Sequence, residues 1–423
     1  MFRKGFALRG NFLWSEGPDE LNIRAGAVAV CDENGLCAGV FDELPEWYKT
    51  LPVRELGETL ILPGYSDLHF HASQYEDLGL GMDLTLLDWL QELTYPEEAR
   101  FQNAGYARNV YGRLAEELRA GFTTRVAAFA TVHREGTEIL MELLNGAGLA
   151  GYVGKVNMDR NAPEYIRERD AAFSLEETER WVAETAGRFE TIRPILTPRF
   201  VPSCTPELME GLGQLRKKYA LPLQSHLDEQ PEEIAWVREL CPGSESYAHV
   251  YDKDGLLGPD VLMAHCVYLT DEECALLKQT GTWVVHCPCS NSNVRSGIAP
   301  IRKYLDLGLN IGLGSDISGG HSLDMADTLR EALSVSRLLW RLGEERYTHL
   351  SAREVFYLAT AGGGAFFGKV GRFEPGYAFD AVAVDDGPWR RPGDDLSARF
   401  QKMIYRATAR NVTAKYVAGK MLF

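Results

Sequence analysis

The sequence contains 423 residues, of which 45% are hydrophobic and 25% are charged. This is an ordinary globular composition, and it allows a large buried core. The 60 acidic and 44 basic side chains give a formal net charge of −16. That balance argues against nucleic acid or an anionic membrane as a partner, because both need clustered lysine and arginine. It favours a soluble enzyme that acts on a small, weakly charged molecule.

The first ten residues carry charge and precede no apolar core of the ~7–15 residues that a signal peptide needs. No uncharged apolar run approaches the ~18–20 residues of a membrane span. The eight cysteines are scattered along the chain, and Cys287 and Cys289 come closest to a metal-type pair without forming a Cys-x-x-Cys motif. We therefore interpret the cysteines as reduced, mostly buried thiols, and we expect a cytoplasmic protein.

Both ends of the chain contain short β-type runs. Residues 25–31 form such a run near the N-terminus, and the turn signal Glu33-Asn34-Gly35 follows it. Residues 381–384 and 414–423 have the same character near the C-terminus. From these runs we expect one small β-sandwich domain that combines residues 1–60 with residues 372–423.

Between these ends, strand-like and helix-like segments alternate, which is typical of βαβ units around a parallel sheet. The expected strands begin near Ile61, Thr123, Tyr152, Pro194, Leu221, Val261, Thr282 and Asn310. The expected helices include residues 84–93, 106–120, 175–189, 206–219, 231–240 and 271–279. Eight β/α units fit an α/β fold of the (β/α)8 TIM-barrel type over residues 61–371. The alternative, an open doubly wound sheet, prefers a glycine-rich phosphate loop after its first strand, where this chain has histidines.

The first expected barrel strand ends in the segment Asp67-Leu68-His69-Phe70-His71. Because side chains alternate along a strand, His69 and His71 project from the same face about 6–7 Å apart. Two imidazoles in that arrangement can bind one ion. We therefore interpret both as metal ligands rather than as core histidines.

Three later strands end in further residues that bind or serve a metal, namely His226, His265 and Asp316. The C-terminal ends of TIM-barrel strands meet at one mouth, so these side chains are expected to converge with the first pair. His265 is also compatible with a purely structural role at the end of its strand. His286 is equally compatible with a position that supports the site and with a structural position at the rim of the barrel. We expect Asp67 and Asp228 to bind backbone groups or to support the metal ligands rather than to bind the metal themselves.

Three imidazoles and one carboxylate suit zinc or iron and leave a coordination position for water. A metal lowers the pKa of such a water to around 7, which makes hydroxide available at neutral pH. Glu229 follows His226 by three residues and can take the water proton and return it to a substrate. Asp316 is expected to bind the metal and hold the attacking water, while His265 donates to the atom that gains negative charge. These three residues, Glu229, His265 and Asp316, are the expected catalytic set.

Several sequence blocks between about Leu62 and Gly376 carry a family resemblance. They are residues 63–75, Leu87-Asp88-Trp89-Leu90, Thr94-Tyr95-Pro96-Glu97-Glu98, Thr197-Pro198-Arg199-Phe200, and residues 225–229, 263–265, 286–291 and 314–320. Together they resemble the amidohydrolase superfamily of metal-dependent hydrolases. The His-x-His pair is common to that superfamily, whereas Ala72-Ser73-Gln74, the Trp89 segment and Arg199-Phe200 are narrower and resemble the guanine deaminase family.

The resemblance implies that the chain catalyses the hydrolytic deamination of a purine, and it implies a role in that reaction for each matching residue. It implies that zinc, or iron in its place, is bound by His69, His71, His226 and Asp316, and that Glu229 shuttles protons. It implies that the purine is held by Gln74, Arg199 and Phe200, with Trp89 able to stack on the ring. One metal per chain is expected, because we expect no lysine after the third or fourth strand, where relatives with two metals place a carbamylated bridge. The resemblance also implies a homodimer.

The chain departs from the family pattern at a few positions: Cys289, Leu227-Asp228 and Ser315. Other functions stay open at this point. A related aminohydrolase would act on 8-oxoguanine, a thioadenosine-like nucleoside or a triazine. A non-catalytic protein that binds a purine or a metal would keep the fold, but Glu229 argues against it because binding alone needs no proton shuttle. The Cys-x-x-Cys signature of the cytidine-deaminase type is absent from the sequence.

Overall fold

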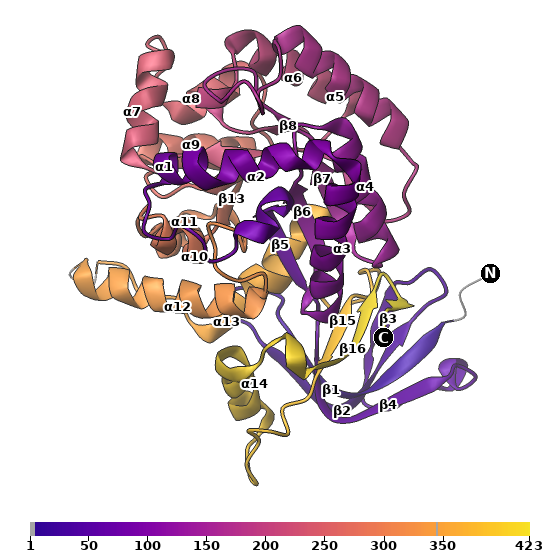
Figure 1. The fold of residues 1–423 in the computed structure, drawn as a ribbon. Coiled ribbons are helices and arrows are strands. Elements are labelled where there is room, and N and C mark those ends of the chain that lie inside the picture. The colour runs from indigo at the N-terminus through magenta and orange to yellow at the C-terminus, as the bar shows by residue number, and fades with distance from the viewer. Residues whose placement is uncertain (1–4, 344–345) are drawn as a thin grey trace.

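A computed structural model of the chain describes residues 5–343 and 346–423. Parallel strands in two four-stranded sheets form the centre of the larger part of the molecule (Figure 1). The first sheet contains β5 (Tyr65–His71), β6 (Thr123–Phe129), β7 (Ala150–Gly154) and β9 (Ile192–Pro194). The second contains β11 (Leu223–Leu227), β12 (Val261–His265), β13 (Trp283–His286) and β14 (Asn310–Leu313). A short parallel pair accompanies them, β8 (Val156–Asn157) and β10 (Thr197–Pro198).

Backbone hydrogen bonds connect the two sheets at both of their edges. The N–H of Gln224 in β11 donates to the carbonyl of Leu196, just after β9, at 2.9 Å. On the opposite edge, the N–H of Asp316 donates to the carbonyl of His69 at 2.9 Å, and the N–H of His71 donates to that of Ile317 at 3.0 Å. The strands run parallel and follow one another in chain order. The fold is therefore of the TIM-barrel type.

Helices surround the strands and cover their outer face (Figure 1). The α-helices of the described residues are α1 (Leu86–Trp89), α2 (Tyr95–Ala99), α3 (Ala104–Ala120), α4 (Arg134–Gly146), α5 (Ala171–Thr185), α6 (Pro206–Tyr219), α7 (Pro231–Leu240), α8 (Tyr247–Lys253), α9 (Asp271–Thr280), α10 (Pro288–Asn293), α11 (Ile301–Leu307), α12 (Met325–Leu342), α13 (Ala352–Tyr357) and α14 (Leu396–Arg406), the last of which packs against α12 and α13. Within the described ranges, none of them has the length and apolar character needed to cross a bilayer.

Local sequence explains where several of these helices begin and end. Thr205 caps the start of α6 and is followed by Pro206, whose fixed φ suits the first helical turn. Thr270 and Glu273 form a capping box at the start of α9. The same helix ends at Gly281, which has a φ of 75° that a side chain would disfavour.

The barrel-type strands are buried on both faces. Every residue of β5, β11 and β12 is buried, because helices pack on the outside and side chains from neighbouring strands fill the inside. Polar side chains at the C-terminal ends of these strands are therefore the ones that can meet at an open mouth. His71 is the last residue of β5 and His265 is the last residue of β12.

Strands from both ends of the chain form a separate seven-stranded sheet (Figure 1). In spatial order they are β17 (Lys420–Met421), β16 (Val412–Val417), β15 (Ala381–Val384), β4 (Val53–Leu62), β1 (Phe6–Trp14), β2 (Asn22–Cys31) and β3 (Cys37–Phe41). In the described residues this is one continuous sheet rather than the two facing sheets of the expected sandwich. Short alternating runs specify which face is buried, but they do not specify how many sheets the strands form.

Two expected elements differ from the structure. Ile61 and Leu62 were expected to begin the first barrel strand, but they end β4 in the terminal sheet. The apolar run continues into the next strand in sequence, and only Pro63-Gly64 separates β4 from β5. The helix expected at residues 84–93 instead starts at Leu86, passes through a π-helical turn at Leu90–Thr94 and continues as α2. Pro96 lies in the first turn of α2, so it does not end the helix.

Lys415 ties the terminal sheet to the barrel-type region. It lies in β16, is fully buried, and donates from Nζ to the carbonyls of Leu118 at 2.7 Å and Gly121 at 3.0 Å. These carbonyls belong to the last turn of α3 and the residue beyond its end, where no backbone N–H of the helix is left to satisfy them. The lysine thus completes the hydrogen bonding of α3 from the other sheet.

Candidate active site

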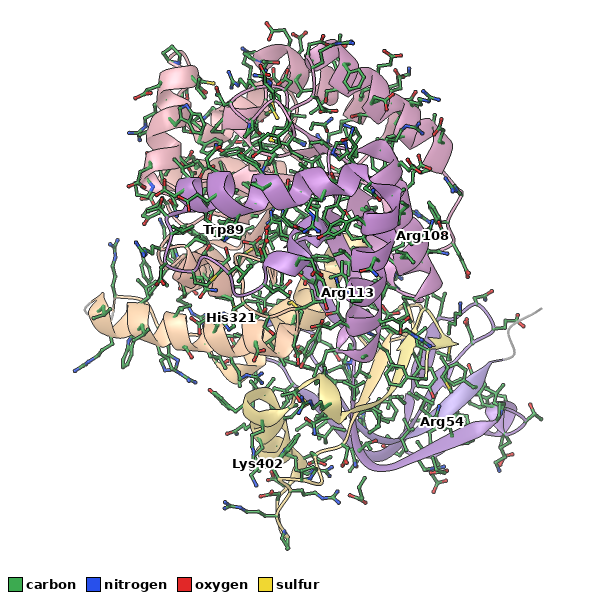
Figure 2. All side chains as sticks on the ribbon, viewed as in Figure 1. Arg54, Trp89, Arg108, Arg113, His321 and Lys402 are labelled. Atoms are coloured by element: carbon green, nitrogen blue, oxygen red, sulfur yellow. The ribbon has the colours of Figure 1, made fainter. Side chains whose placement is uncertain are left out.

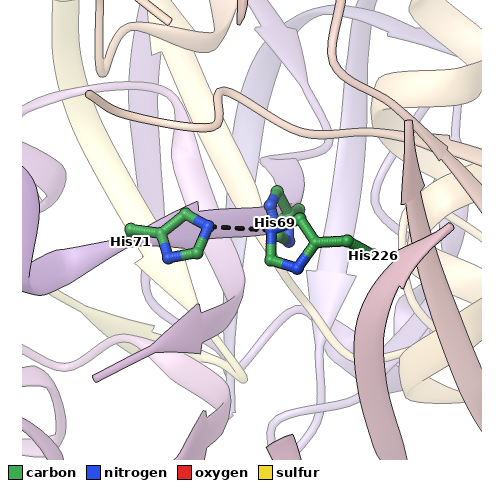
Figure 3. A group of neighbouring side chains, drawn as sticks. All are labelled: His69, His71 and His226. Atoms are coloured by element: carbon green, nitrogen blue, oxygen red, sulfur yellow. Dashed lines mark hydrogen bonds between the residues drawn. The ribbon is translucent and has the colours of Figure 1, made fainter. Parts of the chain in front are cut away.

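Three histidines from two strands converge at the mouth of the barrel-type region (Figure 3). The Nε2 atoms of His71 and His226 are 3.1 Å apart. The Oδ1 atom of Asp316 is 3.1 Å from Nε2 of His69 and 3.6 Å from Nε2 of His71. One ligand atom from each of His69, His71 and His226 lies within 4.8 Å of the others, and the same holds for His69, His265 and Asp316.

The electrostatic state of these histidines suits a cation. Burial lowers the pKa of His69, His71 and His226 well below the usual value, and the neighbouring histidines lower it further. The rings are therefore neutral, and each offers a lone pair. In the described part of the chain, Nε2 of His69 has no hydrogen-bond partner, although Oδ1 of Asp316 is close. Two acceptors that face each other in this way fit a shared metal ion.

The residues behind the cluster hold it in place. Nδ1 of His226 donates to the backbone carbonyl of Arg199, which leaves the lone pair on Nε2 facing the cluster. Asp67 accepts from the N–H of Ser315 at 3.0 Å and from its hydroxyl at 2.5 Å. Burial raises the pKa of Asp67 to about 7. As expected, Asp67 holds backbone, and it does so one residue before Asp316, which has a φ of 46°.

Glu229 and His265 lie beside the cluster. Nε2 of His265 is 3.4 Å from Oε2 of Glu229 and 3.7 Å from Oδ2 of Asp316. The hydroxyl of Ser296 donates to Oε1 of Glu229 at 2.9 Å, and Nδ1 of His265 is 2.9 Å from Oδ1 of Asn291. Burial, followed by the charge of Asp316, raises the pKa of Glu229 to about 8. A carboxyl in this environment can both take and release a proton near neutral pH.

A cavity opens beside these groups. Its lining includes all the sequence-predicted site residues except His69, which lies just behind it: His71, Gln74, Trp89, Arg199, Phe200, His226, Glu229, His265 and Asp316. The indole N–H of Trp89 donates to the carbonyl of Leu80 at 3.1 Å, so this ring is fixed at α1 (Figure 2). Phe200 packs edge-on against His226.

Gln74 and Arg199 lie on one side of this cavity, and the carboxylate of Glu98 connects them. Nε2 of Gln74 donates to Oε1 of Glu98 at 2.7 Å, and Nη1 of Arg199 donates to Oε2 at 2.7 Å. The guanidinium of Arg199 also lies over the ring of Tyr95, 5.2 Å from its centroid. The side chains of the Gln74–Arg199 pair are thus oriented by the helix that follows the π-helical turn.

The expectation that no lysine follows the third strand was wrong, since Lys155 comes directly after β7. It does not reach the cluster, because its Nζ donates to Glu168 at 2.5 Å and to the carbonyl of Val156. His286 lies buried at the end of β13 and does not line the cavity. His321 is exposed in the loop before α12 (Figure 2).

Sequence reasoning assigned no role to four residues that support the site: Glu98, Glu233, Asn291 and Ser296. Glu233 accepts the backbone N–H of Glu229 at 2.9 Å. Glu98 and Asn291 lie in the sequence blocks that carry the family resemblance, so the sequence marked both positions but did not indicate what they do. Ser296 stands outside every block, and its contact with Glu229 spans 67 positions in the chain.

Comparisons with known proteins agree with this geometry. The amidohydrolase family pattern matches residues 60–422. The guanine deaminase of Dictyostelium discoideum is 38% identical over 379 residues, which cover 88% of this chain and 84% of that protein. The guanine deaminase of Escherichia coli (strain K12) is 32% identical, with 99% of this chain and 97% of that protein covered. A crystal structure of guanine deaminase from C. acetobutylicum, with guanine bound in its active site, is 44% identical and has a TM-score of 0.97.

That structure is covered over its whole length, and 99% of this chain is covered in return. The family pattern likewise spans far more than half of the chain. The chain therefore belongs to the amidohydrolase family, in the group that includes the guanine deaminases.

Proposed function

We propose that the chain catalyses the hydrolytic deamination of guanine to xanthine and ammonia. The observation that carries this proposal is one cavity that joins the histidine and aspartate cluster, the carboxyl of Glu229 and the hydrogen-bond donors of Arg199 and Gln74. The relatives named guanine deaminase, one of them with guanine in its active site, support the same substrate.

We also propose one divalent metal per chain, Zn²⁺ with Fe²⁺ as the alternative, held by His69, His71, His226 and Asp316. The neutral imidazoles and the unpartnered Nε2 of His69 support this donor set. When bound, such a metal acts as a Lewis acid and brings the pKa of a water in the site to about 7.

In this mechanism Glu229 carries the protons. It takes one from the attacking water and delivers it to N3 of guanine as the bond between the water oxygen and C2 forms. It then moves the remaining hydroxyl proton to the 2-amino group, so that the C2–N bond breaks, ammonia leaves and C2 becomes the carbonyl of xanthine. Nδ1 of His265 donates to Asn291, so Nε2, 3.4 Å from Glu229, donates a hydrogen bond to the oxygen on which charge builds up when both ring nitrogens carry a proton.

The purine is recognised by its acceptor edge. Arg199 only donates hydrogen bonds, so it fits O6 and N7 of guanine. Gln74 adds an amide donor beside it. The rings of Phe200 and Trp89 line the cavity and can pack on the faces of the purine.

We propose that residues 61–371 form a closed (β/α)8 barrel domain and that residues 1–60 with 372–423 form a small composite β domain. The hydrogen bonds at both edges of the parallel sheets and the shared terminal sheet support this division. A homodimer in the cytoplasm completes the proposal, and light scattering of the purified protein measures its mass directly.

The experiment that tests the function follows guanine, xanthine and ammonia together in a metal-replete preparation. Adenine, cytosine, 8-oxoguanine, a thioadenosine and a triazine serve as competing substrates. Equal amounts of xanthine and ammonia from guanine, formed faster than any other product, support the proposal. Turnover of another member of the panel in preference to guanine contradicts the substrate, and no turnover with bound metal contradicts the enzyme activity.

A further inference from the structure

Glu98 is a buried carboxylate that does not line the active-site cavity. Glu98 is 1% exposed, and it lies in α2 just after the π-helical turn at Leu90–Thr94. One of its oxygens accepts from Gln74 and the other accepts from Arg199, each at 2.7 Å. Both of these residues line the cavity, so Glu98 acts on the cavity only through them.

The contacts of Gln74 fix which end of its amide faces which neighbour. A carboxylate has no proton to give, so Gln74 must turn its NH2 group toward Glu98. The amide oxygen accepts the backbone N–H of Ser318 at 3.2 Å. One N–H of Gln74 is left for the cavity, while its oxygen is already engaged. The residue therefore presents a donor to a ligand.

The same carboxylate keeps Arg199 in place. Arg199 is 3% exposed, and a buried guanidinium is costly unless a partner neutralises it. Glu98 binds Nη1 from one side, and the ring of Tyr95 lies against the guanidinium plane. The remaining N–H groups of Arg199 are free to face the cavity, so the wall formed by Arg199 and Gln74 offers donors only.

We propose that Glu98 is a positioning residue that sets this hydrogen-bond polarity and thereby selects ligands whose facing edge only accepts. The proposal rests on the proposed function, since guanine has O6 and N7 on such an edge. A purine with an amino group at C6 would place a donor against donors, which leaves buried N–H groups unpaired. Substrate choice would then depend on a residue that never touches the substrate.

The test replaces Glu98 with Gln and compares two substrates that lose the same 2-amino group. Guanine has a carbonyl at C6, whereas 2,6-diaminopurine has an amino group there. In Glu98→Gln one side of the new amide carries N–H groups, which favours a flipped Gln74 or a displaced Arg199. We expect kcat/KM for guanine to fall by roughly 10–100-fold, the scale for a buried donor that loses its partner, mostly through a higher KM. The preference for guanine over 2,6-diaminopurine should shrink by a similar factor.

Glu97 provides the matched control on the same helix. It is also buried, but it binds the hydroxyl of Tyr106 and the guanidinium of Arg100 rather than Gln74 or Arg199. Glu97→Gln should keep the preference of the wild type even if it lowers the melting temperature. An equal loss of preference in both variants would mean that Glu98 acts through general packing, and it would overturn the proposal.

Two further variants keep the proposal testable if Glu98→Gln folds poorly. Glu98→Asp retains the charge and the acceptors but withdraws them by one methylene, so KM for guanine should rise while the preference persists. An unchanged KM in Glu98→Asp overturns the positioning role.

Gln74→Ala should lower kcat/KM for guanine by a smaller factor in Glu98→Gln than in the wild type, because both changes act on one contact. Guanine turnover by the wild type without these effects rejects the role of Glu98 alone, whereas no guanine turnover by the wild type rejects the proposed function itself.

Discussion

The Nε2 atom of His265 lies 3.4 Å from Oε2 of Glu229. His265 ends β12, and Glu229 follows β11, the strand that pairs with it in parallel register. The backbone N–H of Glu229 is held by Glu233, and the ring of His265 is held by Asn291. Both side chains are therefore held in place beside the histidine cluster, as the roles proposed for Glu229 in proton transfer and for His265 in hydrogen bonding require.

Replacing Glu229 with Gln should remove the proton shuttle and keep the rest of the site. We expect kcat to fall by roughly 10²–10⁴, the usual contribution of a positioned acid–base group, while metal content stays unchanged. The exposed Glu232 on α7 provides a control, and Glu232→Gln should behave as the wild type. Steady-state kinetics on guanine with elemental analysis checks this. Wild-type kcat in a metal-replete Glu229→Gln protein would exclude Glu229 from the mechanism.

Metal removal should abolish turnover, and one equivalent of Zn²⁺ per chain should restore it. The expectation follows from the buried ligand atoms of His69, His71 and His226, from Asp316 beside His69 and His71, and from Lys155, which is bound to Glu168 instead of bridging a second ion. Elemental analysis before and after chelation gives the stoichiometry. Two metals per chain, or full activity in the chelated protein, would contradict the single-metal site.

Replacing Arg199 with Lys keeps the charge but loses the planar fork that pairs with two acceptors. We expect a loss of kcat/KM for guanine that exceeds any loss of fold stability, together with a smaller preference over adenine. Arg193, exposed on β9, supplies the control variant Arg193→Lys. The prediction fails if Arg199→Lys retains wild-type kinetics, or if the wild type prefers adenine. Gln74→Ala should weaken purine binding with little effect on the metal.

Lys415 should make stability depend on pH in the alkaline range. Burial lowers its pKa to about 7 in the folded protein, against roughly 10.4 in an unfolded chain. Between these values the unfolded chain carries a proton on this lysine and the folded chain does not, so the free energy of unfolding of the wild type rises with pH. The stability gained in this way is lost again as pH falls toward 7. Below 7 both states are protonated and the contribution is constant.

The comparison with Lys415→Met isolates this effect, because methionine does not titrate and leaves carbonyls at the end of α3 without their donor. At pH 9 we expect its free energy of unfolding to be lower by about 1–3 kcal/mol. The difference from the wild type should grow between pH 7 and 10. Lys420→Met, at an exposed position on β17, should show no such trend. Urea unfolding across this range measures both, and a difference that shrinks with pH would contradict the assignment.

The convergence of the histidines at the strand ends was predictable because its signals are local. His69 and His71 share a face by strand alternation, and the C-terminal ends of parallel strands meet whatever the details of the loops. Helices α6 and α7 also matched expectation in both bounds, since a cap or a proline marks their starts.

Most of the parts that sequence reasoning missed depend on tertiary contacts or on backbone shapes without a local signal. The break between β4 and β5 did have a local signal, since Pro63-Gly64 marks a turn, but the strand expected from Ile61 ran across it. The π-helical turn at Leu90–Thr94 lets the helix continue into α2, beyond residue 93, where the expected helix ends. The role of Glu98 depends on a hydrogen bond to Arg199 across 101 positions, which neither spacing nor periodicity shows.

The seven-stranded sheet has a consequence for synthesis on the ribosome. Strand β4 pairs with β1 early in the chain, but its other edge pairs with β15, and about 320 residues separate Leu62 from Ala381. At about 5–20 residues per second, that edge waits on the order of tens of seconds for its partner. During this interval β4 presents unpaired N–H and C=O groups that can recruit a strand from another nascent chain. Slower elongation after residue 62 therefore lengthens the time in which this edge is open to aggregation.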